Sequence, residues 1–164
     1  MPHPILQHQL TQDVKLLHKV ALISNNKVLI LKRSLTAKSR PGKWDLPGGN
    51  SEWPVEQSIN QINLHQQDLA REVIEETGIT IATESFLIDN LAYFATFYEA
   101  DRQIYSINCG WIINLDQNSG QLPSVLISDE HSEFVWISLS QLDEYDFGGP
   151  NRDYETAIIR KALG

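Results

Sequence analysis

The sequence has very little cysteine: among 164 residues the only one is Cys109. A single cysteine excludes an internal disulfide bond and fits a reducing compartment, so we expect a cytoplasmic protein. Cys109 lies in the apolar stretch INCGWII. This setting is typical of a buried structural thiol rather than of a nucleophile.

Long apolar runs are also missing. No stretch approaches the length of a membrane span, and the first residues, MPHPILQHQLTQDVK, lack the basic start and apolar core of a secretory signal. We therefore expect no association with a membrane. Repeats and low-complexity tracts are absent too, and the length fits a single domain over residues 1–164.

Positive charge is scarce, because 13 basic residues face 21 acidic ones and the net charge is −8. This balance argues against stable binding of nucleic acid. An acidic protein can still bind phosphates when a divalent cation stands between them. Locally the balance reverses, since Lys32 to Lys43 holds five basic residues and no acid. This segment is either a solvated loop or a seat for phosphates.

Strand signals come first along the chain. The apolar runs LLHKVALI and VLILK flank SNNK, which predicts a hairpin with Asn25 and Asn26 in the turn. The stretch KRSLTAKSRPGKWDLPGG predicts a loop with at most a short strand near Trp44 to Leu46. Residues 84–115 predict two or three strands, and FVWISL predicts another.

Helix signals follow. NLHQQDLAREVIEETG predicts a helix with Asn63 as N-cap and Gly78 just past its end. We expect a loop before it, although Val55, Ile59 and Ile62 have helical spacing. Ser140 is expected to cap a brief helix. The stretch NRDYETAIIRKAL predicts a final amphipathic helix. Strands and helices mix without regular alternation, which predicts an α+β fold with a mixed sheet between helices, an α/β/α sandwich.

The stretch REVIEETGI gathers carboxylates at the wrong end of this helix. A helix turns about 100° per residue, so Glu72, Glu75 and Glu76 share one face. Like charges at this spacing cost about 0.2–0.5 kcal/mol per pair, and anions in the last turn oppose the helix dipole. A divalent cation would reverse both effects. Oxygen ligands of this kind suit magnesium or manganese bound together with substrate phosphates.

PGKWDLPGG followed by REVIEETGI resembles the Nudix hydrolase family, whose box reads Gly-x5-Glu-x7-Arg-Glu-U-x-Glu-Glu-x-Gly-U with U aliphatic. The second half of the box is complete, from Arg71 to Ile79. Gly49 and Arg71 are 22 positions apart (71 − 49), against about 14 in the family, so about eight residues are inserted in the first half. Glu52 and Glu56 are therefore both candidates for the first glutamate of the box.

The resemblance implies a role for each matching residue. Glu75 and Glu76 would be the main ligands of Mg²⁺ or Mn²⁺, and Glu72 a further ligand or an orienter of the attacking water. Arg71 would hold Glu72 or its neighbours, Gly48 would offer its carbonyl to the metal, and Gly49 would permit close backbone approach. A later acid serves as base or ligand in this family; Glu130 is the first choice and Glu133 the second, while His131 is expected to be a loop residue.

The implied reaction is hydrolysis of a nucleoside diphosphate linked to another group. Arg33 and Arg40 could contact its phosphates and Asn151 a base edge, although loop cations and a helix cap are alternatives. For Tyr93, Phe94, Phe97 and Tyr105 we expect core packing rather than base stacking. A proline associated with ADP-ribose hydrolases is missing, since none lies between Pro54 and Pro123. This favours a (deoxy)nucleoside triphosphate.

Two other readings stay open. The same fold could bind nucleotides without hydrolysis, or act as an isomerase of prenyl diphosphates, for which Cys109 is a poor catalytic candidate. The expected partner is a small nucleotide-type molecule. Whether the chain forms a homodimer, how many metal ions it binds and what the insertion does are left open.

Overall fold

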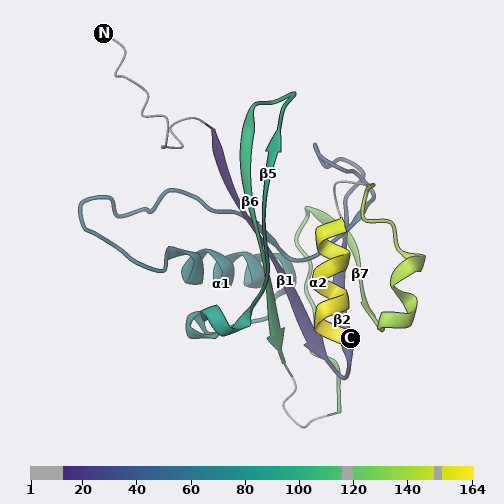
Figure 1. The fold of residues 1–164 in the computed structure, drawn as a ribbon. Helices are drawn as coiled ribbons and strands as arrows, with labels where there is room; N and C mark the ends of the chain where they lie inside the picture. Colours follow the sequence, from purple (N-terminus) through teal and green to yellow (C-terminus); the bar gives the residue numbers. More distant parts are fainter. Residues whose placement is uncertain (1–12, 116–119, 150–152) are drawn as a thin grey trace.

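The computed structural model describes residues 13–115, 120–149 and 153–164. Its centre is a seven-stranded sheet of order β3-β2-β1-β6-β5, with β4 paired to β1 and β7 to β2 (Figure 1). β1 (Val14–Ser24) runs parallel to β6 (Ile104–Asn114), and the other pairs are antiparallel. The mixed sheet is as predicted.

The predicted hairpin joins β1 to β2 (Lys27–Arg33). Asn25 and Asn26 form its turn with φ angles of 49° and 56°. Asparagine tolerates this left-handed conformation, which matches the turn to the twist of the strands. The turn is therefore confirmed.

The remaining strands are short or lie toward the edges of the sheet. They are β3 (Trp44–Asp45), β4 (Gly48–Asn50), β5 (Leu91–Glu99) and β7 (His131–Ile137). The segment of residues 84–115 thus contributes two strands, β5 and β6. β4 was not predicted, because its glycines suggested only a turn.

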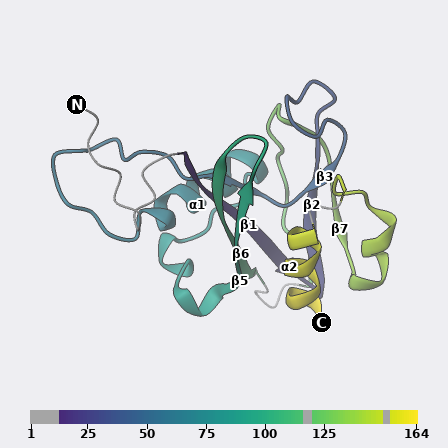
Figure 2. The same cartoon turned by 45° about the horizontal axis from the view of Figure 1, so that its top comes forward.

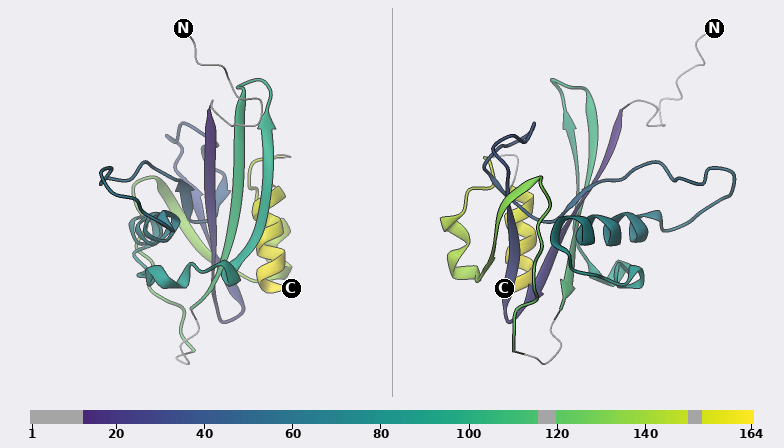
Figure 3. Two further views of the ribbon diagram at one scale, coloured as in Figure 1. Left: turned by 60° about the vertical axis from the view of Figure 1, so that its left-hand side comes forward. Right: turned by 180° about the vertical axis from the view of Figure 1, so that it is seen from behind.

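Helices α1 (Leu64–Thr77) and α2 (Asp153–Leu163) cover opposite faces of the sheet (Figure 3). The strands supply a different set of side chains to each face. Val20 and Leu22 of β1 pack in one buried cluster with Val73 of α1, and Ala21 packs in another with Ile158 of α2. This alternation buries both faces and confirms the α/β/α sandwich.

The helix ends agree with the sequence in part. Gly78 has φ 72° and its amide donates to the Ile74 carbonyl, as expected of a C-cap glycine. Asn63 is the N-cap residue of α1, as predicted, but it has a left-handed φ of 54° and its side chain makes no capping hydrogen bond. Ser140 is not a cap; the 3-10 helix η3 (Leu139–Glu144) begins after Ser138.

Residues 51–63 have neither helix nor strand and form the blue loop that projects beside α1 (Figures 1 and 2). The loop prediction is therefore confirmed. Two further 3-10 turns, η1 (Thr83–Ser85) and η2 (Ile88–Asn90), connect α1 to β5. Within the described ranges, no helix is long and apolar enough to cross a membrane.

The aromatic side chains of β5 do not all pack in the core. Phe94 is 63% exposed and Phe97 is 45% exposed, so the expected burial is wrong for both. The reason is their position, since β5 is an edge strand and the tip of the β5–β6 hairpin rises above both helices (Figure 1). Cys109, by contrast, is buried as predicted.

Candidate active site

The glutamates of α1 differ in exposure although they share one helix face. Glu76 is buried, with 8% of its surface exposed. The Glu72 side chain is 19% exposed and that of Glu75 is 56% exposed. We call these three residues the α1 glutamates. Their exposure decreases from Glu75 through Glu72 to Glu76.

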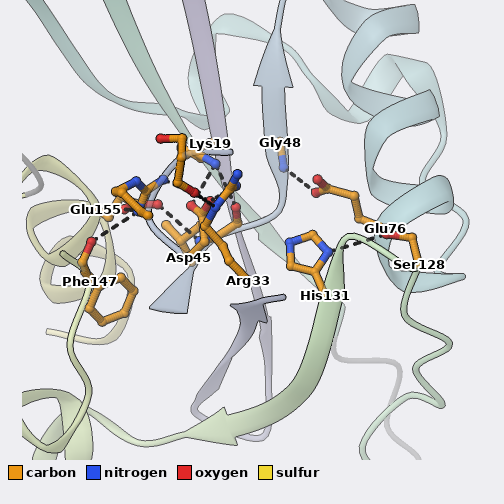
Figure 4. A network of polar contacts seen from close by, with 12 residues as sticks. Lys19, Arg33, Asp45, Gly48, Glu76, Ser128, His131, Phe147 and Glu155 are labelled. Atoms are coloured by element: carbon orange, nitrogen blue, oxygen red, sulfur yellow. Dashed lines mark hydrogen bonds and ion pairs between the residues drawn. The ribbon is translucent and has the colours of Figure 1, made fainter. Parts of the chain in front are cut away.

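Glu76 connects α1 to the sheet. Its Oε2 accepts a hydrogen bond of 2.8 Å from the Gly48 amide of β4 (Figure 4). Burial raises the pKa of Glu76 to about 8, although Lys19 and the Gly48 amide act in the opposite direction. A buried carboxylate without a full positive partner is a group that a cation would stabilise.

The two glycines of β4 allow this close approach. Gly48 has φ 136°, and a Cβ atom there would lie 2.2 Å from the His18 carbonyl oxygen, so another side chain cannot fit. A Cβ on Gly49 would lie 3.2 Å from the carboxyl carbon of Glu72. Gly49 therefore gives the close approach that was predicted, and the metal-binding role of the Gly48 carbonyl stays a prediction.

Arg71 holds two α1 glutamates together. Its Nη1 lies 3.1 Å from Glu72 Oε1 and 3.2 Å from Glu75 Oε2. The contact predicted between Arg71 and Glu72 is therefore present. The pKa of Glu72 is raised by burial, and Arg71 counteracts this shift.

The inserted segment reaches the same arginine through Glu52. Glu52 Oε2 lies 3.8 Å from Arg71 Nη2. Glu56 instead accepts a 2.7 Å hydrogen bond from the Ser58 amide inside the loop. Of the two candidates for the first glutamate of the box, only Glu52 contacts Arg71 in this structure.

The donor set of this site fits a divalent cation in its chemistry. Carboxylate oxygens are the ligands that Mg²⁺ and Mn²⁺ prefer, and Glu76 is a buried acid whose charged form needs a positive partner. In the part of the chain that the structure describes, however, no three Asp, Glu, His or Cys side chains are grouped to hold a metal ion. In this structure Glu72 and Glu75 are paired with Arg71.

A second group of charges lies next to β4, around Asp45. Asp45 Oδ1 lies 2.7 Å from Lys19 Nζ, and its Oδ2 lies 3.2 Å from Arg33 and 3.1 Å from Arg40 (Figure 4). Arg40 also lies 3.5 Å from Glu155 of α2. We call these five side chains the Asp45 network. Asp45, Lys19 and Glu155 are buried.

The pKa values of the two acids in the Asp45 network are shifted in opposite directions. Burial disfavours charge, but Lys19 and Arg40 overcome it and lower the pKa of Asp45. The pKa of Glu155 is raised well above its usual value by burial and by Asp45. Glu155 Oε1 accepts a hydrogen bond from the Leu46 amide.

The predicted phosphate ligands Arg33 and Arg40 thus belong to the Asp45 network. Arg33 also donates to the Ser39 carbonyl, and Arg40 to the Phe147 carbonyl. Both guanidinium groups have protein partners, so the basic segment is tied into the fold rather than freely solvated. Their contact with phosphate stays a prediction.

The other predicted site residues are less informative. The Glu130 side chain is exposed, and its carbonyl accepts a hydrogen bond from the Ser34 amide. Glu133 pairs with Lys32 on the exposed edge of β7. His131 is a buried strand residue rather than a loop residue, and burial lowers its pKa. Asn151 lies outside the described residues.

A pocket of about 480 Å³ lies on the α2 side of the sheet. Ser106 and Asn108 of β6 contribute to its lining, together with Phe97 and Tyr154. Ser106 Oγ and Asn108 Oδ1 are buried without a hydrogen-bond partner. Such orphaned atoms in a cavity are suited to the polar groups of a ligand.

Sequence reasoning missed Lys19, Asp45 and Glu155. A signal existed for two of them. Lys19 interrupts an apolar strand, and Glu155 shares a helix face with Ile158 and Ile159 at positions i+3 and i+4. A charge on an apolar face indicates a buried partner of opposite sign.

Comparisons with known proteins agree with this geometry. A NUDIX domain model matches residues 18–157. The MutT protein of Methanosarcina mazei Go1 is 25% identical, with a TM-score of 0.61, over 93% of this chain and 97% of that one. The MutT NUDIX hydrolase of Burkholderia pseudomallei is 17% identical, with a TM-score of 0.61, over 92% of this chain and 98% of that one.

A third similar structure belongs to a longer protein. The bifunctional NMN adenylyltransferase/ADP ribose pyrophosphatase of Francisella tularensis, complexed with AMP and a Mn ion, is 21% identical with a TM-score of 0.61. The match covers 95% of this chain and 44% of that one. A search of curated proteins finds no match. Because the family model covers most of the sequence and the α1 glutamates are complete, this chain belongs to the NUDIX family and is an enzyme of the pyrophosphohydrolase class.

Proposed function

We propose that the chain, acting as a single domain, hydrolyses the diphosphate linkage of (deoxy)nucleoside triphosphates with Mg²⁺ or Mn²⁺. Glu76 carries the proposal. It is a buried carboxylate whose pKa is raised to about 8, and among the described residues the Gly48 amide is its one hydrogen-bond donor. A cation at this position would remove the cost of its charge.

Glu72, Glu75 and Glu76 would hold the cation. When bound, it would neutralise phosphate oxygens and lower the pKa of the attacking water. The chain's own residues would position the site: the Gly48 amide holds Glu76, and Gly49 lies against Glu72. Glu130 stays the first choice for a base, on its place just before β7.

The pocket on the α2 side supports a nucleoside as the other part of the substrate. Phe97 could stack on a base, while Ser106 Oγ and Asn108 Oδ1 could bond to its edge. The pocket lies along β1, since it includes Leu17, which pairs with Asn50 of β4. The pocket therefore lies near the strand that carries Gly48 and Gly49.

ADP-ribose is the alternative substrate. It is favoured by the similarity to the Francisella protein, whose description includes an ADP ribose pyrophosphatase. The missing proline after the box favours a triphosphate instead. A nucleotide-binding module without hydrolysis is disfavoured because Glu72, Glu75 and Glu76 are all present. A cytoplasmic location stays a prediction from the single cysteine.

The substitution Glu76→Gln tests the function. We expect hydrolysis to fall by about 100-fold or more, because the main carboxylate ligand loses its charge. Circular dichroism should be unchanged. Glu144→Gln, at an exposed glutamate of η3, is the control and should keep full activity. Near-normal turnover by Glu76→Gln would refute the proposal.

The substrate is identified from the products. With Mg²⁺ or Mn²⁺, a triphosphate and one water should give a nucleoside monophosphate and pyrophosphate. ADP-ribose and one water would give AMP and ribose 5-phosphate. Faster formation of the second pair would favour the alternative substrate, and binding without any product would favour the binding module.

A further inference from the structure

His18 of β1 is a polar side chain buried within an apolar layer. It is 3% exposed, and its neighbours on the same face of β1, Leu16 and Val20, pack in the apolar cluster that includes α1. Its ring bonds to Trp111 of β6 and to Ser51, which directly follows β4. The proposed metal site does not include this ring, so its buried polar contacts need another explanation.

The ring of His18 has a defined direction of hydrogen bonding. The Trp111 indole can only donate, and its Nε1 lies 3.1 Å from His18 Nδ1. Nδ1 must therefore accept, which leaves the proton of the neutral ring on Nε2. Nε2 then donates to Ser51 Oγ at 3.1 Å. The ring thus connects β6 to the end of β4 in one tautomer.

The same indole packs against the first turn of α1. The ring of His65 is stacked on that of Trp111, with 5.1 Å between the centroids and 13° between the planes. His65 Nε2 lies 3.1 Å from the Phe86 carbonyl oxygen, so the ring is also held from the segment that follows α1. Trp111 therefore contacts α1 through His65 and β4 through His18.

The proposed metal site is divided between α1 and β4. Backbone bonds hold β4 within the sheet, and the Ser51 amide donates to the Leu16 carbonyl at 2.8 Å. These bonds act in the plane of the sheet, so they do not set the distance of α1 above it. Side chains between the two layers set that distance, and the stack of His65 on Trp111 is one such contact. His18 fixes the indole of this stack relative to β4.

The α1 glutamates contact β4 closely enough to depend on this spacing. His18 lies opposite Gly49 in the pairing of β1 with β4. A Cβ atom on Gly49 would lie 3.2 Å from the carboxyl carbon of Glu72. The Gly48 amide donates to Glu76 at 2.8 Å. A change in the spacing of α1 and β4 would alter both contacts, because each is already at contact distance.

We propose that His18 is a positioning residue: its ring holds the Trp111 indole and the Ser51 hydroxyl, and so fixes the spacing of α1 and β4 at the metal site. The ring contacts neither metal nor substrate in this role, and it transfers no proton. The proposal rests on the proposed metal site, since its effect is on the affinity for the cation.

Calorimetric titration of the whole chain with Mn²⁺ tests the proposal. His18→Leu removes both hydrogen bonds and should weaken Mn²⁺ binding by about tenfold, as expected when a residue that orients metal ligands is lost. His18→Asn places a carbonyl oxygen near the position of Nδ1, so Trp111 keeps its acceptor and most of the affinity should remain. Leu142→Ala controls for stability alone, because Leu142 is buried in the cluster of α2, and it should leave the affinity unchanged.

Two further measurements do not require His18→Leu to fold. NMR of the imidazole nitrogens in the unmodified chain should show His18 protonated on Nε2 and not on Nδ1. Ser51→Ala, at a partly exposed residue, removes the acceptor of this proton and should weaken Mn²⁺ binding in the same direction as His18→Leu.

A proton on Nδ1 would overturn the proposal. Unchanged Mn²⁺ affinity in His18→Leu and Ser51→Ala would overturn it too, and so would an equal loss of affinity in His18→Leu and Leu142→Ala, which would reflect stability alone. Absence of any Mn²⁺ uptake by the unmodified chain would instead overturn the proposed function.

Discussion

The molecule contains two groups of carboxylates on either side of β4, and they are balanced differently. The Asp45 network has two acids and three basic side chains, all from the chain itself. The α1 glutamates are three acids that share one arginine, and this arginine also faces Glu52 and Asp68. In the Asp45 network every acid has a basic partner, whereas the α1 glutamates have fewer basic partners than acids.

This difference separates a structural role from a binding role. Buried charges that are fully paired hold segments of the chain together, and removing one partner is costly. A partly buried group with too little opposite charge favours a ligand that brings it. The same residue types therefore predict different functions once their partners are counted.

Breaking the Asp45 network should have the largest effect on stability. Asp45→Asn leaves the buried Lys19 ammonium without its 2.7 Å partner, so the free energy of unfolding should fall by about 3–5 kcal/mol. Urea denaturation measures the change. Glu133→Gln, which breaks an exposed pair with Lys32, should cost at most about 1 kcal/mol. Similar losses for the two variants would show that burial of the network contributes little.

Adding metal should stabilise only through the α1 glutamates. Mn²⁺ at about 100 times its dissociation constant should raise the free energy of unfolding by about 2.7 kcal/mol. The increase should be absent in Glu76→Gln and unchanged in Asp45→Asn, which lies in the other group. Thermal denaturation with and without Mn²⁺ gives both values. If Mn²⁺ stabilised Glu76→Gln but not Asp45→Asn, the metal would bind at the Asp45 network and not at the α1 glutamates.

A change of pH should act on the metal-free protein through Glu76. Its pKa is raised from 4.5 to about 8, so the folded chain holds the proton more tightly than the unfolded chain. The resulting stabilisation is complete below about pH 4.5 and is lost as pH rises toward 8. The slope is at most about 1.4 kcal/mol per pH unit.

Comparison with Glu76→Gln isolates this slope. Glu155 also has a raised pKa and changes the free energy of unfolding with pH in the same direction. Because Glu155 is present in both proteins, its effect cancels in the difference between them. The stability of the unmodified chain should fall relative to that of Glu76→Gln between pH 5 and 8. Parallel denaturation curves over this range would show that Glu76 titrates normally.

Local patterns predicted much of the fold. The turn at Asn25 and Asn26, the end of α1 at Gly78 and the loop of residues 51–63 each follow from residues adjacent in sequence. The cap of η3 was misplaced by two residues, because Ser138 and Ser140 are both good caps. The choice between them depends on where β7 ends.

Only the part of the site that depends on the spacing of residues along one helix could be predicted from the sequence. One helix face brings Glu72, Glu75 and Glu76 together, and this required no tertiary information. The pairing of Arg33 and Arg40 with Asp45 could not be read from the sequence. It depends on how a long loop folds back, and every cation in that loop has similar local surroundings.

Gly48 carries a consequence for related sequences. The carbonyl oxygen of His18 fills the space where a side chain would begin, whatever happens at α1. A relative that had lost all of its α1 glutamates would still need this glycine in order to fold. The presence of Gly48 alone would therefore say nothing about hydrolysis by such a relative.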